Sequence, residues 1–115
     1  MNRDFDDAEA YNIGNAKARK GDYDGAILNY TEAIRLKPDF AEAYYNRGNA
    51  KDDKGDYDGA ILDYNDAIRL KPALAFAYYN RALVKNRLGQ IEGAKADYKK
   101  AKELNPNAPI IPELE

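Results

Sequence analysis

Apolar residues in the middle of the chain recur with the period of an α-helix. Between residues 57 and 71 they fall at i, i+1, i+4, i+7 and i+8, on one face of a helix with about 3.6 residues per turn: Ala60, Ile61, Tyr64, Ala67 and Ile68. The preceding residues 41–54 are rich in helix formers and end at Gly55, which suits the left-handed conformation that follows many helices. Pro72 cannot continue the second helix. The pattern therefore predicts two helices joined by a short turn.

This two-helix pattern recurs with a shift of 34 residues. The segment GDYDGAIL occupies residues 21–28 and 55–62, and IRLKP occupies 34–38 and 68–72. Residues 7–40 and 41–74 agree at 22 of 34 positions, and residues 75–108 agree with 41–74 at 15 of 34. A single helical hairpin cannot bury its apolar face alone, so neighbouring units must stack. We expect one domain of three units (7–40, 41–74 and 75–108), with an N-terminal extension at 1–6 and a tail at 109–115.

The spacing of residues within each unit resembles the tetratricopeptide repeat (TPR) family. In the second unit the matching residues are Tyr44, Gly48, Gly55, Tyr57, Ala60, Tyr64, Ala67 and Pro72, and the resemblance covers residues 7–108. It implies an all-α fold, a right-handed superhelical α-α solenoid of about six helices. Ala10 stands where the family has a large aromatic residue, so we expect an under-packed N-terminal edge that Phe5 could fill.

The resemblance also implies a binding surface. In TPR proteins the first helices of the repeats line a concave groove that binds extended peptides or helices. The groove positions here are Tyr11, Tyr45 and Tyr79, then Asn12, Asn46 and Asn80, then Asn15, Asn49 and Leu83. An asparagine amide can pair with both groups of a peptide backbone, and tyrosine adds rigid contact area with a polar tip. Local helix packing for the asparagines and a place in the core between repeats for the tyrosines are the alternatives.

The two ends of the expected groove differ in chemistry. Phe76, Tyr79 and Leu83 lie at i, i+3 and i+7 and form an apolar patch at the C-terminal end. The acidic Glu42, Asp52 and Asp53 lie in the middle, flanked by Arg19 and Arg87. These residues predict a ligand with an apolar anchor and a basic residue, although a solvated charged face is the alternative for the charges. Arg47 and Arg81 occupy a position that is usually apolar, and we expect them in structural ion pairs.

One well-known TPR ligand class fits poorly. Cochaperone TPRs hold acidic chaperone C-termini in a two-carboxylate clamp made of Lys, Arg and Asn side chains. The matching positions in this sequence hold Tyr11, Asn15, Asn46, Phe76 and Asn80. The asparagines of the second and first repeats are present, but all three cations are missing. Without charge-assisted hydrogen bonds to the carboxylates, this partner class is disfavoured.

The last unit differs from the first two where a following repeat would pack. The second unit has Ile61, Leu62 and Ile68, and the third has Lys95, Ala96 and Lys102 at the same positions. We therefore interpret residues 91–104 as a terminating helix. The prolines at 109 and 112 prevent a regular helix in the tail, where Ile110 and Ile111 could dock on the last repeat as an extended strip. A frayed tail is the alternative.

Composition narrows the possible functions. The 115 residues include no Cys and no His, which excludes disulfides, thiolate or imidazole metal sites, and Ser-His or Cys-His nucleophiles. The formal net charge is −2 with interspersed signs, which argues against nucleic-acid or membrane partners, and no apolar run approaches the ~20 residues of a membrane span. Adjacent Asp pairs diverge on a helix and cannot share a proton. We expect a soluble protein that is not an enzyme and uses no cofactor and no metal; the cytoplasm is favoured, but the sequence determines no compartment.

The sequence thus predicts a protein–protein interaction adaptor that binds a partner's peptide segment in a groove. Two other interpretations remain open. The chain could be a structural module that forms a homo-oligomer through its apolar edges, or a fragment or consensus-like engineered scaffold without a natural partner. The near-identity of the first two units favours the last interpretation more than usual.

Overall fold

The computed structural model describes residues 6–115, so the expected role of Phe5 lies outside the described residues. This part of the chain forms six α-helices and one short 3₁₀ helix. Their bounds are α1 Asp7–Arg19, α2 Tyr23–Leu36, α3 Ala41–Lys54, α4 Tyr57–Leu70, α5 Ala75–Arg87, α6 Ile91–Leu104 and η1 Pro112–Leu114. The predicted all-α fold, a solenoid of helical repeats, is confirmed.

Short polar signals set the ends of the helices. Asp6, Asp22 and Asp56 each accept a hydrogen bond from the backbone N–H three residues on, at 2.7, 3.0 and 3.0 Å, and so cap α1, α2 and α4. The turn between the two helices of a unit contains a glycine in the left-handed region: φ is 82° at Gly21, 89° at Gly55 and 78° at Gly89. These tight turns make the helices of each unit antiparallel neighbours.

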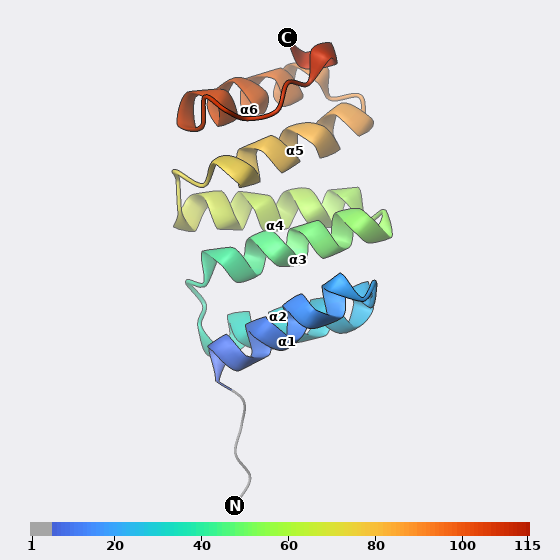
Figure 1. Cartoon of the computed structure of the whole chain (residues 1–115), viewed down its shortest axis with the longest axis vertical. Helices are drawn as coiled ribbons and strands as arrows, with labels where there is room; N and C mark the ends of the chain where they lie inside the picture. Colours follow the sequence, from blue (N-terminus) through green and yellow to red (C-terminus); the bar gives the residue numbers. More distant parts are fainter. Residues whose placement is uncertain (1–5) are drawn as a thin grey trace, which may run out of the picture.

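The helices stack in chain order into an elongated molecule (Figure 1). Its principal extents are 56 × 25 × 21 Å, and each helix packs against the helix before it and the helix after it. Within a unit the contact is close: a Cβ added at Gly48 would lie 2.8 Å from the ring of Tyr64, and one at Gly14 would lie 2.7 Å from the ring of Tyr30. The rings of Tyr30, Tyr64 and Tyr98 are buried at the centre of the three helix pairs.

Buried ion pairs join the two helices of a unit, and their arginines reach back to the preceding unit. Arg47 on α3 donates two hydrogen bonds to Asp63 on α4, at 2.9 and 2.7 Å, and one to Thr31 on α2 at 3.2 Å. Lys51 adds a second cation 3.1 Å from Asp63. The third unit repeats this arrangement with Arg81, Lys85 and Asp97, and Arg81 reaches back to Asn65 on α4. The expected structural ion pairs of Arg47 and Arg81 are therefore confirmed.

The tail docks on α6, but only in part as expected. Ile111 and Leu114 are buried against Tyr98, and the Ile111 N–H donates to the Tyr98 hydroxyl at 3.1 Å. Ile110 points away from the core and is 70% exposed. Counted in steps of 34 residues, Ile111 takes the place of Ala43 and Ala77, so the tail covers α6 where a further helix would otherwise pack.

The N-terminal edge differs from the expectation. Ala10 is 1% exposed and lies in an apolar cluster with Ala33 and Ala43. Tyr11 and Phe40 pack against this cluster. The expected open gap at Ala10 is therefore wrong, because aromatic residues from the neighbouring positions cover the small side chain.

The buried ion pair yields a stability prediction. Replacing Asp63 by Ala leaves the half-buried charges of Arg47 and Lys51 without their anion, so Asp63→Ala should lower the free energy of unfolding by about 3–5 kcal/mol. The control Asp24→Ala removes the exposed ion pair with Lys54 and should change stability far less. Urea unfolding followed by circular dichroism measures both variants. Equal losses would contradict the role assigned to Asp63.

Candidate functional site

Asparagines on the first helix of each unit form a hydrogen-bonded ladder between units. The Nδ2 group of Asn46 on α3 donates to Oδ1 of Asn15 and to the Tyr11 hydroxyl, both on α1 and both at 2.9 Å. Asn80 on α5 makes the same two bonds one unit later, to Asn49 Oδ1 at 3.0 Å and the Tyr45 hydroxyl at 2.8 Å. We call Asn15, Asn46, Asn49 and Asn80 the asparagine ladder. It joins the first helices of successive units.

The buried tyrosines of the first two helix pairs donate hydrogen bonds to the ladder. The Tyr30 hydroxyl donates to Asn15 Oδ1 at 2.6 Å, and the Tyr64 hydroxyl donates to Asn49 Oδ1 at 2.5 Å. Burial raises the pKa of Tyr30 to about 12, and burial raises the pKa of Tyr64 further. Burial also raises the pKa of Tyr45, against the opposing effect of its contacts with Asn49 and Asn80. These hydroxyls therefore stay protonated over the whole neutral range.

The ladder uses one half of each amide. Its bonds engage Nδ2 of Asn46 and Asn80, and Oδ1 of Asn15 and Asn49. Outside the ladder remain two acceptors, Oδ1 of Asn46 and Asn80, and two donors, Nδ2 of Asn15 and Asn49. The two interpretations of the asparagines, local packing and ligand contact, thus apply to different halves of the same side chains.

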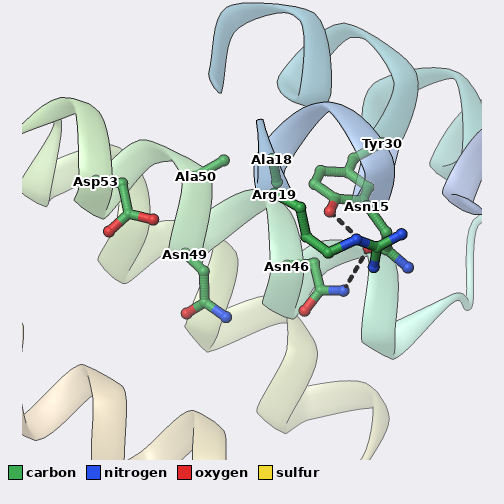
Figure 2. Close-up of a pocket in the computed structure, with 8 residues that line it drawn as sticks. All are labelled: Asn15, Ala18, Arg19, Tyr30, Asn46, Asn49, Ala50 and Asp53. Atoms are coloured by element: carbon green, nitrogen blue, oxygen red, sulfur yellow. Dashed lines mark hydrogen bonds between the residues drawn. The ribbon is translucent and has the colours of Figure 1, made fainter. Parts of the chain in front are cut away.

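A hollow of about 280 Å³ opens on the ladder between α1 and α3. It is lined by Asn15, Ala18, Arg19, Tyr30, Asn46, Asn49, Ala50 and Asp53 (Figure 2). We call it the first hollow. The next junction, between α3 and α5, carries larger side chains at equivalent places: Asp52 instead of Ala18, and Val84 instead of Ala50. Asp52 there pairs with Arg87 at 3.1 Å. Small side chains and the lack of this ion pair therefore open the first hollow.

Two opposite charges border the first hollow. Figure 2 shows Arg19 and Asp53 on opposite sides of Asn49. Within residues 6–115 neither of them forms an ion pair, whereas Arg87 is held by Asp52 and lies over the Tyr57 ring. Burial raises the pKa of Asp52, against the opposing effect of Arg87. Among residues 6–115, the groove charges without an ion pair thus border the first hollow, and Asp52 and Arg87 at the second junction neutralise each other.

The ladder ends at the third unit. Leu83 stands where the first two units have Asn15 and Asn49, so the Tyr98 hydroxyl has no amide to reach and instead accepts from the Ile111 N–H. Tyr79 and Leu83 pack against the cluster that contains Ile111 and Leu114. The expected apolar patch at this end is therefore partly covered by the chain's own tail.

A second hollow, of about 150 Å³, lies beside that covered region. It is lined by Ala75, Phe76, Tyr79, Asn80, Ala101, Asn105, Ala108 and Pro109. We call it the C-terminal hollow. Phe76 remains 59% exposed at its rim. Three residues expected from the sequence, Phe76, Tyr79 and Asn80, meet here.

The remaining expected residues occupy different environments. Tyr11 and Tyr45 are half-buried. The ring centroids of Tyr11 and Phe40 are 4.8 Å apart, and those of Tyr45 and Tyr64 are 5.9 Å apart. Asn12 is exposed at the open end of the ladder. The sequence analysis did not identify Tyr30, which lines the first hollow, or Ala108, which lines the C-terminal hollow. The repeat alignment itself held the signal for Ala108, which replaces Phe40 and Leu74.

Comparison with known protein families agrees with this architecture. A family model described as TPR repeat matches residues 14–51 and 53–89, and one described as tetratricopeptide repeat matches residues 75–108. The chain belongs to the tetratricopeptide repeat family. TPR domains are interaction modules rather than enzymes. The buried Tyr30, Tyr64 and Tyr98 all lie inside the matched segments.

Solved TPR structures superpose closely on the chain. The first TPR of Spaghetti (RPAP3), bound to the HSP90 peptide SRMEEVD, has a TM-score of 0.86 and 30% identity, covering 94% of this chain and 83% of that one. The Arabidopsis OM64 TPR domain also has a TM-score of 0.86, with 26% identity, covering 94% of this chain and 87% of that one. None of the curated protein sequences matches the chain.

Two structural features are absent from residues 6–115. The helices there are too short or too polar to cross a membrane. The same residues include no cluster of three or more carboxylate side chains able to hold a metal ion.

The ladder tyrosines yield a pH prediction. In the unfolded chain, tyrosines lose their protons above a pH of about 10, whereas Tyr30 and Tyr64 keep theirs in the folded chain. The contribution of this difference to the free energy of unfolding is therefore complete below pH 10 and is lost as the pH rises toward 12. Tyr64→Phe should cost about 1 kcal/mol at neutral pH and flatten this alkaline loss. Urea unfolding between pH 7 and 11 measures both effects. An unchanged alkaline slope in the variant would contradict this assignment.

Proposed function

We propose that the chain is a protein–protein interaction adaptor that binds an extended peptide segment of a partner in its concave groove. The main support is the first hollow, where ladder amides line an open space next to the charges of Arg19 and Asp53. The family and the peptide-bound structural relative support the same general activity.

The amides favour recognition of a peptide backbone. The donor Nδ2 of Asn15 and the acceptor Oδ1 of Asn46 lie on adjacent helices, and together they match the C=O and N–H groups of an extended chain. The ladder bonds hold both amides in one orientation before a ligand arrives. Because these amides are already ordered, binding a peptide backbone costs less conformational entropy than it would with mobile amides.

The charges give the ligand a direction. Arg19 attracts an acidic group and Asp53 attracts a basic one, and the two side chains lie on opposite sides of Asn49. A bound segment would therefore place an acidic residue near α1 and a basic residue near the end of α3. Both charges are exposed, so they contribute to specificity more than to affinity.

The peptide of the RPAP3 domain is not the ligand that we propose. That peptide ends in EEVD, which contains two glutamates and a C-terminal aspartate. At the three clamp positions where cations are required, this chain has Tyr11, Phe76 and Asn80. The cation of the second junction, Arg87, is already held by Asp52. The groove therefore lacks the charges that would hold two carboxylates.

Self-assembly is the second candidate function. It is favoured by Leu28 and Leu62, which are 73% and 64% exposed and occupy equivalent places on α2 and α4. Light scattering over a concentration series distinguishes it from the adaptor function. A monomer at all concentrations is expected for the adaptor, and a concentration-dependent dimer would favour self-assembly.

A variant that closes the first hollow tests the proposed function. The substitutions Ala18→Asp, Ala50→Val and Asp53→Arg copy the second junction of the same protein and leave the ladder untouched. Peptides selected from a random display library on the wild-type chain should bind with micromolar dissociation constants, and the triple variant should weaken binding at least about tenfold. Isothermal titration calorimetry measures both affinities.

Two controls accompany this experiment. Lys99→Ala, on the exposed face of α6, should leave peptide affinity unchanged. The SRMEEVD peptide should bind more weakly than any selected peptide, because the clamp cations are missing. Selected peptides that bind the triple variant as tightly as the wild type would overturn the proposal, provided that urea unfolding shows the variant to be folded.

A further inference from the structure

The C-terminal hollow is formed by one small residue. The last position of the three units holds Phe40, Leu74 and Ala108. In the first unit the Phe40 ring packs on Tyr11, with ring centroids 4.8 Å apart, beside the buried Ala33. The equivalent neighbours in the third unit are Tyr79 and Ala101, and both line the C-terminal hollow. The space that a phenyl ring fills in the first unit is therefore open in the third.

We propose that the C-terminal hollow takes an aromatic or branched aliphatic side chain of the partner's peptide as an anchor. This inference rests on the proposed function, because it names the residue class that the groove reads at its C-terminal end. The protein itself provides the precedent for the occupant: a phenylalanine fits this space against Tyr11, and Leu74 holds the equivalent place in the second unit. Filling the hollow removes its apolar surface from contact with water, which favours binding.

The lining excludes a charged anchor. None of the residues that line the hollow carries a formal charge, and Asn105 takes the place of Lys37, whose ammonium lies over the Phe40 ring in the first unit. A charged side chain would lose its hydration there without gaining a counter-ion. Phe76, exposed at the rim, extends the apolar surface toward solvent.

The hollow is continuous with the asparagine ladder. Asn80 lines it, and the same Asn80 side chain donates to Asn49, which lines the first hollow. Oδ1 of Asn80 lies outside the ladder and can accept a backbone N–H next to the anchor. A peptide that pairs with the ladder amides therefore brings a side chain to the C-terminal hollow.

The test uses a small probe and a variant that fills the hollow. The probe is N-acetyl-L-phenylalaninamide, titrated into the ¹⁵N-labelled chain and followed by NMR. Saturable shifts are expected for the amides of Phe76, Tyr79 and Ala108, with weaker or no response to N-acetyl-L-alaninamide and N-acetyl-L-lysinamide. Ala108→Phe copies the first unit, so it should abolish the response and raise the melting temperature.

A matched control separates filling from added hydrophobicity. Ala73→Phe places the same ring at an exposed position of the loop before α5. In that loop the neighbouring Leu74 already occupies the place equivalent to Ala108. The Ala73→Phe variant should leave the probe response unchanged. Equal responses of the wild type and Ala108→Phe, or a response to all three probes alike, would overturn the anchor proposal.

Peptide affinity distinguishes this inference from the proposed function. Peptides selected on the wild-type chain should contain Phe, Tyr, Leu or Ile at a fixed position, and should lose at least about tenfold in affinity on Ala108→Phe. Selected peptides that depend on the first hollow but not on Ala108 would overturn the anchor and leave the proposed function intact. A wild-type dimer that Ala108→Phe converts to a monomer would identify the occupant as a second copy and overturn the inference.

Discussion

One repeated contact joins the first helices of successive units, the bond by which a ladder asparagine reaches back to the preceding unit. Asn46 holds Asn15 and Tyr11, and Asn80 holds Asn49 and Tyr45, so each first helix is fixed against the one before it. The tyrosine beneath each acceptor amide fixes the amide plane as well. Stacking between units and preparation of the groove are thus one interaction. Half of each amide is used for the stack, and the other half lies outside these bonds.

A perfect repeat would give a uniform groove, and the hollows occur where the repeat is imperfect. Ala18 and Ala50 open the first junction, while Asp52 and Val84 close the second. Ala108 opens the C-terminal end where Phe40 fills the equivalent space in the first unit. The polar hollow and the apolar hollow lie on the same face, joined by the ladder. Variation between nearly identical units therefore gives this groove its chemical character.

The sequence predicted the fold because the fold is local. Helix period, the turn glycines and the capping Asp residues each act within a few positions, and a 34-residue shift repeats them. Arg47 and Arg81 were also predictable in kind, since a cation at a usually apolar position requires a buried anion, which Asp63 and Asp97 supply.

The details of the site were harder to predict because they depend on contacts between units. The sequence indicated that asparagines and tyrosines share one face, but it could not show which half of each amide is used internally. That division follows from Asn46 lying within 2.9 Å of two acceptors on α1. Similarly, Ile111 docks and Ile110 does not, because only one of two adjacent side chains in an extended strip can face Tyr98. The expected gap at Ala10 was wrong for the same reason: Phe40 comes from the neighbouring unit boundary.

We propose that the ladder amides serve the stack with one half and a peptide with the other. NMR of the asparagine side-chain NH₂ groups, without and with a selected peptide, tests it most directly. We expect slow hydrogen exchange for Asn46 and Asn80 in both states, and large shifts on binding for Asn15 and Asn49. Fast exchange of the Asn46 and Asn80 groups in the free protein, or binding shifts confined to the second helices of the units, α2, α4 and α6, would contradict it.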